Sequence, residues 1–104
     1  MDLKHFEQLR EMANSFSARG VEIHEHHYFG LAFGNWTLVA GKRKERIRFD
    51  WDGRDAFLTI SEAKFPDSQH STDWNQIRQL GINSEDGREV WQAVSDFLEV
   101  KFAV

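Results

Sequence analysis

Residues 45–60 read ERIRFDWDGRDAFLTI, and apolar and polar side chains alternate along most of them. Such alternation is typical of a β-strand that buries one face, because successive side chains point to opposite sides of a sheet. Asp52-Gly53 interrupts the pattern, and Asp-Gly is among the strongest signals of a two-residue hairpin turn. These residues therefore predict two antiparallel strands, 45–51 and 54–65.

The same two-residue period continues towards the N-terminus. Residues 21–28 and 31–40 form two more alternating runs, which are separated from each other by Phe29-Gly30. Residues 41–44 separate the second run from the strand at 45–51. Short alternating runs with turn signals between them predict a four-stranded antiparallel meander.

Helices are predicted before and after this meander in the sequence. In residues 3–19 and 85–101, apolar residues recur every three or four positions, which places them on one face of a helix. A shorter helix is predicted over 73–80, where Trp74, Ile77 and Leu80 follow the same spacing.

The register of the sheet follows from the shortest turns that separate the strands. The expected strand-end pairs are Tyr28–Leu31, Ala40–Glu45 and Trp51–Arg54. One face of the sheet is then entirely apolar, and it carries Val21, Ile23, Trp36, Leu38, Ile47, Phe49, Trp51, Ala56, Leu58 and Ile60. Both long helices are expected to cover this face. The predicted fold class is α+β, a two-layer sandwich in the order α-β-β-β-β-(α)-α, with residues 1–104 as one domain.

The opposite face of the predicted sheet mixes polar and apolar side chains. Its polar part includes His24, His26, Arg46, Arg48 and Asp50. Its apolar part consists of Tyr28, Leu31, Phe33, Val39 and Phe57. A solvated sheet face seldom collects so many large apolar groups, so either residues 66–82 cover it or it binds another molecule.

Composition excludes several classes of protein. The 104 residues contain no cysteine, which excludes disulfides, a thiol nucleophile and cysteine-ligated metals. No uncharged run approaches the ~18 residues of a transmembrane helix. The first residues lack the order typical of a secretory signal, so a cytoplasmic location without membrane contact is expected. The net charge of −4 argues against a general nucleic-acid binder.

Two arrangements of side chains are candidate chemical sites. Glu22, His24 and His26 follow one face of a predicted strand, and two imidazoles with a carboxylate can bind a metal or small ligand. Asp50 and Asp55 fall opposite each other near His24, which suits acid–base chemistry. No nucleophile motif or phosphate loop accompanies them. No catalytic residue, metal ligand or cofactor is assigned, and an enzyme is not expected.

A basic segment favours a different function. Residues 42–48 hold five basic residues and one acidic residue, and open-face aromatics beside them can stack on bases. Glu85, Asp86 and Glu89 at the start of the last predicted helix would repel phosphate. Nucleic-acid binding is therefore the alternative function.

The sequence predicts a small soluble binding module that uses the open sheet face. Its expected partner is another protein or a second copy of the chain, as a homodimer. Aromatic and arginine side chains contribute most of the binding energy in protein interfaces. The predicted binding residues are Tyr28, Phe33, Arg46, Arg48, Phe57, His24 and Asp50.

Overall fold

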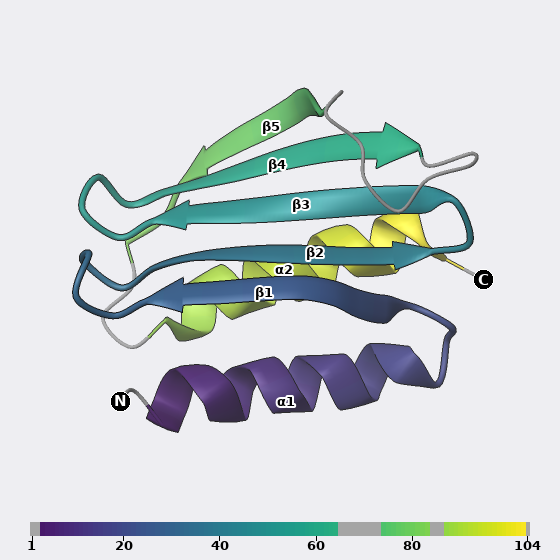
Figure 1. Cartoon of the computed structure of the whole chain (residues 1–104), viewed down its shortest axis with the longest axis horizontal. Helices are drawn as coiled ribbons and strands as arrows, with labels where there is room; N and C mark the ends of the chain where they lie inside the picture. Colours follow the sequence, from purple (N-terminus) through teal and green to yellow (C-terminus); the bar gives the residue numbers. More distant parts are fainter. Residues whose placement is uncertain (1–2, 65–73, 84–86, 104) are drawn as a thin grey trace.

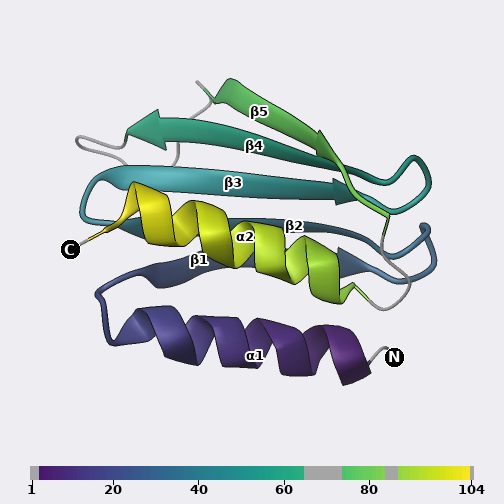
Figure 2. The ribbon, with the colours of Figure 1, turned by 180° about the vertical axis from the view of Figure 1, so that it is seen from behind.

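The computed structural model describes residues 3–64, 74–83 and 87–103. Its elements along the chain are α1 (Leu3–Ser17), β1 (Glu22–Phe29), β2 (Asn35–Lys42), β3 (Glu45–Asp52), β4 (Phe57–Lys64), β5 (Asn75–Gly81) and α2 (Arg88–Lys101). The strands form one antiparallel sheet in the order β1-β2-β3-β4-β5 (Figure 1). The helix α2 crosses one face of the sheet, and α1 runs alongside β1 (Figure 2).

The predicted α+β sandwich is confirmed, but the predicted strand number is wrong. The segment expected to be a helix over 73–80 is the fifth strand, β5, which pairs with β4. The spacing of three between Trp74, Ile77 and Leu80 suited a helix. A bulge at Ile77 takes up one extra residue, so Leu80 packs against the core while Trp74 lies on the other face of the sheet. The last predicted helix begins at Arg88 within the described residues.

The two central hairpins differ from the predicted register by even numbers of residues. Glu45 is the partner of Lys42 instead of Ala40, a shift of two residues. Trp51 is the partner of Leu58 instead of Arg54, a shift of four. An even shift keeps every side chain on its original face, because side chains alternate with a period of two. The predicted core face of β2, β3 and β4 is therefore correct, with Leu38, Ile47, Phe49, Leu58 and Ile60 fully buried.

The first hairpin differs from the prediction by an odd number of residues. Tyr28 is the partner of Trp36 instead of Leu31, a shift of five. This shift turns the C-terminal half of β1 over, so His26 and Tyr28 face the helices and not the open face as predicted. A bulge between Ile23 and Glu25 turns the strand back. Ile23 therefore still packs against the core.

The core lies between the sheet and the two helices. From α2 it receives Val90, Trp91, Val94 and Leu98, and from α1 Met12 and Phe16. The rings of Trp36 and Trp91 are stacked, with centroids 4.7 Å apart and an interplanar angle of 6°. Among the described residues, neither helix combines the length and apolarity needed to span a membrane.

Candidate functional site

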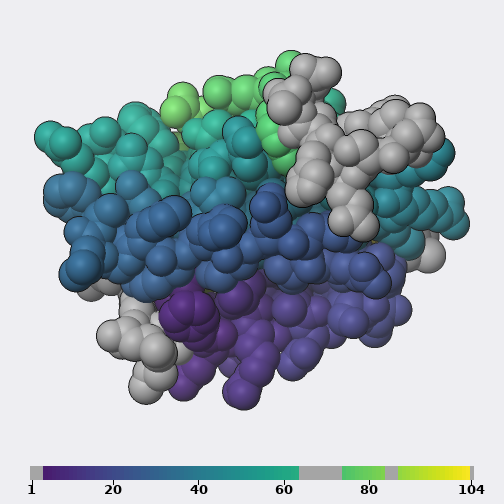
Figure 3. All heavy atoms as spheres, viewed as in Figure 1, coloured from purple at the N-terminus to yellow at the C-terminus, as the bar shows by residue number. Residues whose placement is uncertain are grey.

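We call the sheet face opposite the helices the open face. Neither helix covers it, and Figure 3 views the molecule from this side. The strand register places Arg46, Arg48, Asp50 and Phe57 on it, as predicted. Residues 74–82 extend the sheet and do not fold over this face, apart from the Trp74 ring. Residues 65–73 lie outside the described residues.

A polar cluster occupies the centre of the open face. The Thr37 hydroxyl donates to one oxygen of Asp50 at 2.9 Å. The Arg48 Nε donates to the other oxygen of Asp50, also at 2.9 Å. The Arg48 guanidinium lies 4.8 Å from the ring centroid of Trp74. Both Asp50 oxygens have donors and the Arg48 charge is compensated, so this cluster is a closed ion-pair network.

The arrangement expected for acid–base chemistry is not assembled. The partner of Asp50 on β4 is Thr59, whereas Asp55 lies exposed in the loop between β3 and β4. His24 lies at the bulge of β1 and is exposed. Its pKa is lowered, first by partial burial and second by the nearby Arg46 charge. The predicted opposition of Asp50 and Asp55 is therefore wrong, because the β3–β4 loop is longer than two residues.

The predicted metal or small-ligand arrangement is not assembled either. Glu22 and His24 are exposed, whereas His26 points towards α1 on the other side of the sheet. Within residues 3–64, 74–83 and 87–103, no three His, Asp or Glu side chains gather as a metal site would require. The bulge in β1 is the physical reason, because it changes the face on which His26 lies.

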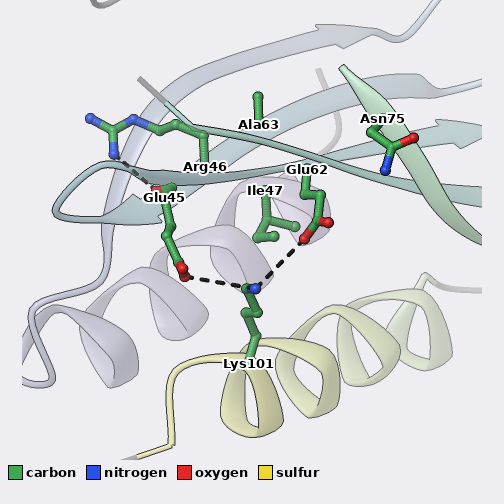
Figure 4. Close-up of a pocket in the computed structure, with 7 residues that line it drawn as sticks. All are labelled: Glu45, Arg46, Ile47, Glu62, Ala63, Asn75 and Lys101. Carbon is green, nitrogen blue, oxygen red and sulfur yellow. Dashed lines mark hydrogen bonds and ion pairs between the residues drawn. The ribbon is translucent and has the colours of Figure 1, made fainter. Parts of the chain in front are cut away.

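At the end of the sheet that carries the β2–β3 turn, several basic side chains form ion pairs or hydrogen bonds. The Arg46 guanidinium donates to the backbone carbonyls of Arg43 and Glu45, at 2.6 and 2.9 Å. On the helix side, Lys101 reaches from α2 between Glu45 and Glu62, with Nζ–Oε distances of 3.7 and 3.6 Å (Figure 4). A hollow of about 240 Å³ is lined by these three residues together with Arg46, Ile47, Ala63 and Asn75. The two carboxylates balance the charges of Lys101 and Arg46, so this hollow has little net attraction for phosphate.

Exposed apolar side chains gather at the opposite end of the sheet. We call them the aromatic tip, and they are Phe29, Leu31, Phe33 and Phe57. The three phenylalanines are 53%, 67% and 42% exposed in that order, and Leu31 is fully exposed. The tip forms where the β1–β2 and β3–β4 loops meet: the Gly53 amide donates to Asn35 Oδ1 at 2.7 Å. The Arg54 guanidinium lies 5.8 Å from the Phe33 ring centroid.

Phe33 has an unusual backbone conformation. Its φ of 58° lies in the left-handed region, which costs a bulky residue on the order of 1–3 kcal/mol. A hydrogen bond from the Asn35 amide to the Ala32 carbonyl, at 3.0 Å, closes the turn around it. Phe33 lies in a loop and not on a strand as predicted, and the flanking Gly30 and Gly34 are the sequence signal of this longer loop. Phe33 therefore combines an unfavourable backbone with an exposed ring.

Tyr28 supports the tip from the helix side of the sheet. A Cβ at Gly30 would lie 3.2 Å from the Tyr28 ring, and one at Gly34 would lie 3.8 Å from its hydroxyl oxygen. On its other side the Tyr28 ring stacks on His5, with centroids 4.2 Å apart. His5 is not among the predicted site residues, because a histidine in the first turn of a helix is usually solvated. Tyr28 is thus a support for the 30–34 loop and not an open-face residue.

Comparison of the chain with protein-family models, with curated proteins and with solved structures finds no significant match. Function is therefore inferred from the geometry of the open face and the aromatic tip.

Proposed function

We propose that this protein is a small non-enzymatic binding module that contacts a protein partner through the open face, with the aromatic tip as its apolar anchor. The observation that carries this proposal is Phe33, whose ring is exposed and whose backbone is strained. Neither property stabilises the fold. Strained residues cluster at binding sites, where the surrounding structure holds them in place.

The size of the tip supports the same proposal. A buried aromatic side chain removes about 150–250 Å² from water, so the exposed parts of Phe29, Phe33 and Phe57 amount to on the order of 300 Å². Leu31 adds to this area. This summed area is at the lower end of the ~300–600 Å² of the largest apolar patches on typical monomers, which are often functional, although Asn35 and Asp52 lie between Phe29 and Phe57 across the sheet.

The charges around the tip favour a second copy of the chain as the first partner to test. Arg54 lies over Phe33, and the Asp52 carboxylate accepts hydrogen bonds from the amides of Arg54 and Asp55 at 3.0 and 3.1 Å. Both signs of charge therefore flank the apolar group. In a two-fold dimer the same patch meets itself, so Arg54 of one copy can face an aspartate of the other.

Replacing Phe33 with asparagine is expected to weaken self-association at least tenfold, or about 1.4 kcal/mol. Folding stability should not fall, because asparagine tolerates the left-handed region and removes an exposed ring. Sedimentation equilibrium measures the association, and urea unfolding measures the stability.

The matched control is Val100→Asn, which changes another exposed apolar residue, 81% accessible on α2. It should leave association unchanged. If Phe33→Asn associates as the wild type does, the tip is not the anchor. A wild type that stays monomeric at high micromolar concentration excludes the second copy and leaves a different protein as the partner.

Binding to nucleic acid is expected to stay in the non-specific range of about 10⁻⁴–10⁻⁶ M at physiological salt. The physical reason is that Arg48 is paired with Asp50 and that Arg46 donates to backbone carbonyls. Fluorescence anisotropy with single- and double-stranded RNA and DNA, repeated over a range of salt, measures this. Sub-micromolar binding that disappears in an Arg46→Ala, Arg48→Ala double variant would replace the proposed function.

A further inference from the structure

A histidine pair joins α1 to β1 beneath the aromatic tip. The Nε2 atoms of His5 and His26 lie 3.0 Å apart, and their rings are nearly parallel, with an interplanar angle of 20° and centroids 5.0 Å apart. His5 is only 5% exposed, although it lies in the first turn of α1. A side-chain hydrogen bond between two buried or half-buried imidazoles depends on where their protons lie.

The neighbouring backbone decides the proton positions of the neutral pair. The Nδ1 atom of His26 lies 3.1 Å from the Thr37 carbonyl oxygen, which can only accept. His26 therefore carries its proton on Nδ1, and its Nε2 accepts from the Nε2–H of His5. When both rings are doubly protonated, both Nε2 atoms are donors. The hydrogen bond is then lost, and two positive charges face each other.

The surroundings of the pair oppose positive charge. His5 contacts the rings of Phe6 on α1, Tyr28 on β1, Trp36 on β2 and Trp91 on α2. The first turn of α1 is also the positive end of its helix dipole.

The charged or titratable residues next to the pair in the sequence are Lys4, Glu25 and His27, and Arg88 and Glu89 lie within one turn of Trp91 on α2. Burial is the main cause that lowers the pKa of His26. A protonated His27 lowers this pKa further, and the hydrogen bond to the Thr37 carbonyl partly offsets both effects.

The lowered pKa determines the sign of the pH dependence. Folded His26 binds fewer protons than unfolded His26, whose pKa is near the ordinary 6.5. The stability from the neutral pair is therefore complete above this pH and declines as the pH falls below it. The pair is part of the junction between α1 and β1.

The junction connects to the aromatic tip through Tyr28, which stacks on His5 and lies against the 30–34 loop. We propose that His5 and His26 form a pH-sensitive latch: protonation of both rings breaks their hydrogen bond, loosens Tyr28 and the loop that carries Phe33, and weakens binding through the aromatic tip. The effect on binding rests on the proposed function, whereas the loosening of the loop does not.

An NMR titration of the wild type between pH 7.5 and pH 5 tests the latch without any partner. The amide resonances of residues 30–34 are expected to shift with the same midpoint as the His26 ring. Fixed amides while His26 titrates would overturn the proposal. This measurement needs no variant, so it holds even if a substitution at the pair prevents folding.

His5→Gln provides the second test. The glutamine amide can donate to a neutral His26 and accept from a protonated one, and it carries no charge. The urea midpoint of the wild type should fall more between pH 7.5 and pH 5 than that of His5→Gln. The control His27→Gln removes an exposed histidine of the same strand, whose charge is the smallest influence on the pKa of His26, so its response should stay much closer to that of the wild type than to that of His5→Gln. Equal responses in all three proteins would overturn the latch.

Sedimentation at the two pH values separates the latch from the proposed function. Wild-type association is expected to weaken at least threefold at pH 5, and that of His5→Gln to change less. If the wild type associates equally at both pH values, control of binding by the latch is excluded. If the loop amides shift but the protein is monomeric at every pH, the latch stands and self-association fails.

Discussion

Replacing Trp91 with alanine is expected to lower the free energy of unfolding by about 3–5 kcal/mol, the usual loss for a buried tryptophan. Trp91 is buried on α2 and stacks on Trp36 of β2. It also contacts His5 of α1, with ring centroids 5.3 Å apart. One side chain therefore joins both helices to the sheet. Because a domain of this size is stable by only ~5–15 kcal/mol, this loss is large.

Urea unfolding followed by far-ultraviolet circular dichroism measures the change, because fluorescence would itself be altered by the loss of an indole. Val100→Ala on the exposed side of the same helix is the control, and it should change stability by no more than about 0.5 kcal/mol. Trp91→Phe should give an intermediate loss and stays measurable if the alanine variant unfolds. A loss below about 1 kcal/mol in Trp91→Ala would contradict the packing of α2 on the sheet.

Replacing Gly53 with alanine is expected to destabilise the protein by about 1–3 kcal/mol, as overpacking usually does. A Cβ at Gly53 would overlap the backbone carbonyl oxygen of Phe33, and backbone has less room to move than the end of a flexible side chain. The Gly53 amide also donates to Asn35. The substitution forces the two loops of the aromatic tip apart, so self-association should weaken together with stability.

Gly81→Ala is the matched control for Gly53→Ala. Its Cβ would meet nothing within 4 Å, so the change should be small or slightly stabilising. Urea unfolding of both variants compares them directly. Equal stabilities would show that the β1–β2 and β3–β4 loops do not meet as described.

Part of the candidate site was predictable from the alternation of apolar and polar residues along the strands alone. Arg46, Arg48 and Asp50 were expected on the open face, and they lie there because the register of β3 differs from the prediction by even shifts only. Their partners were not predictable. Asp50 bonds to Thr37 and Arg48, and not to the loop residue Asp55, because the true hairpin is longer than its Asp-Gly signal indicates.

Longer loops account for the misplacement of Asp55 and Phe33, and bulges account for the other misplaced residues. One extra residue in β1 reverses the face of His26 and Tyr28, and one in β5 lets a helix-like spacing form a strand. A bulge inserts a single residue and leaves little local signal, because packing against the rest of the sheet selects it. The latch between His5 and His26 depends on the first of these bulges.

The α+β class and the buried face of the central strands were determined by local periodicity, because the side chains of each strand or helix must separate into apolar and polar sides wherever it packs. Contacts between distant residues decided that residues 75–81 form a fifth strand, on which side of the sheet Tyr28 lies, and that the turn at Phe33 is left-handed. These features depend on loop lengths and bulges, and each involves a contact with a distant part of the chain: β4 pairs with β5, His5 stacks on Tyr28, and Gly53 lies close against the Phe33 carbonyl.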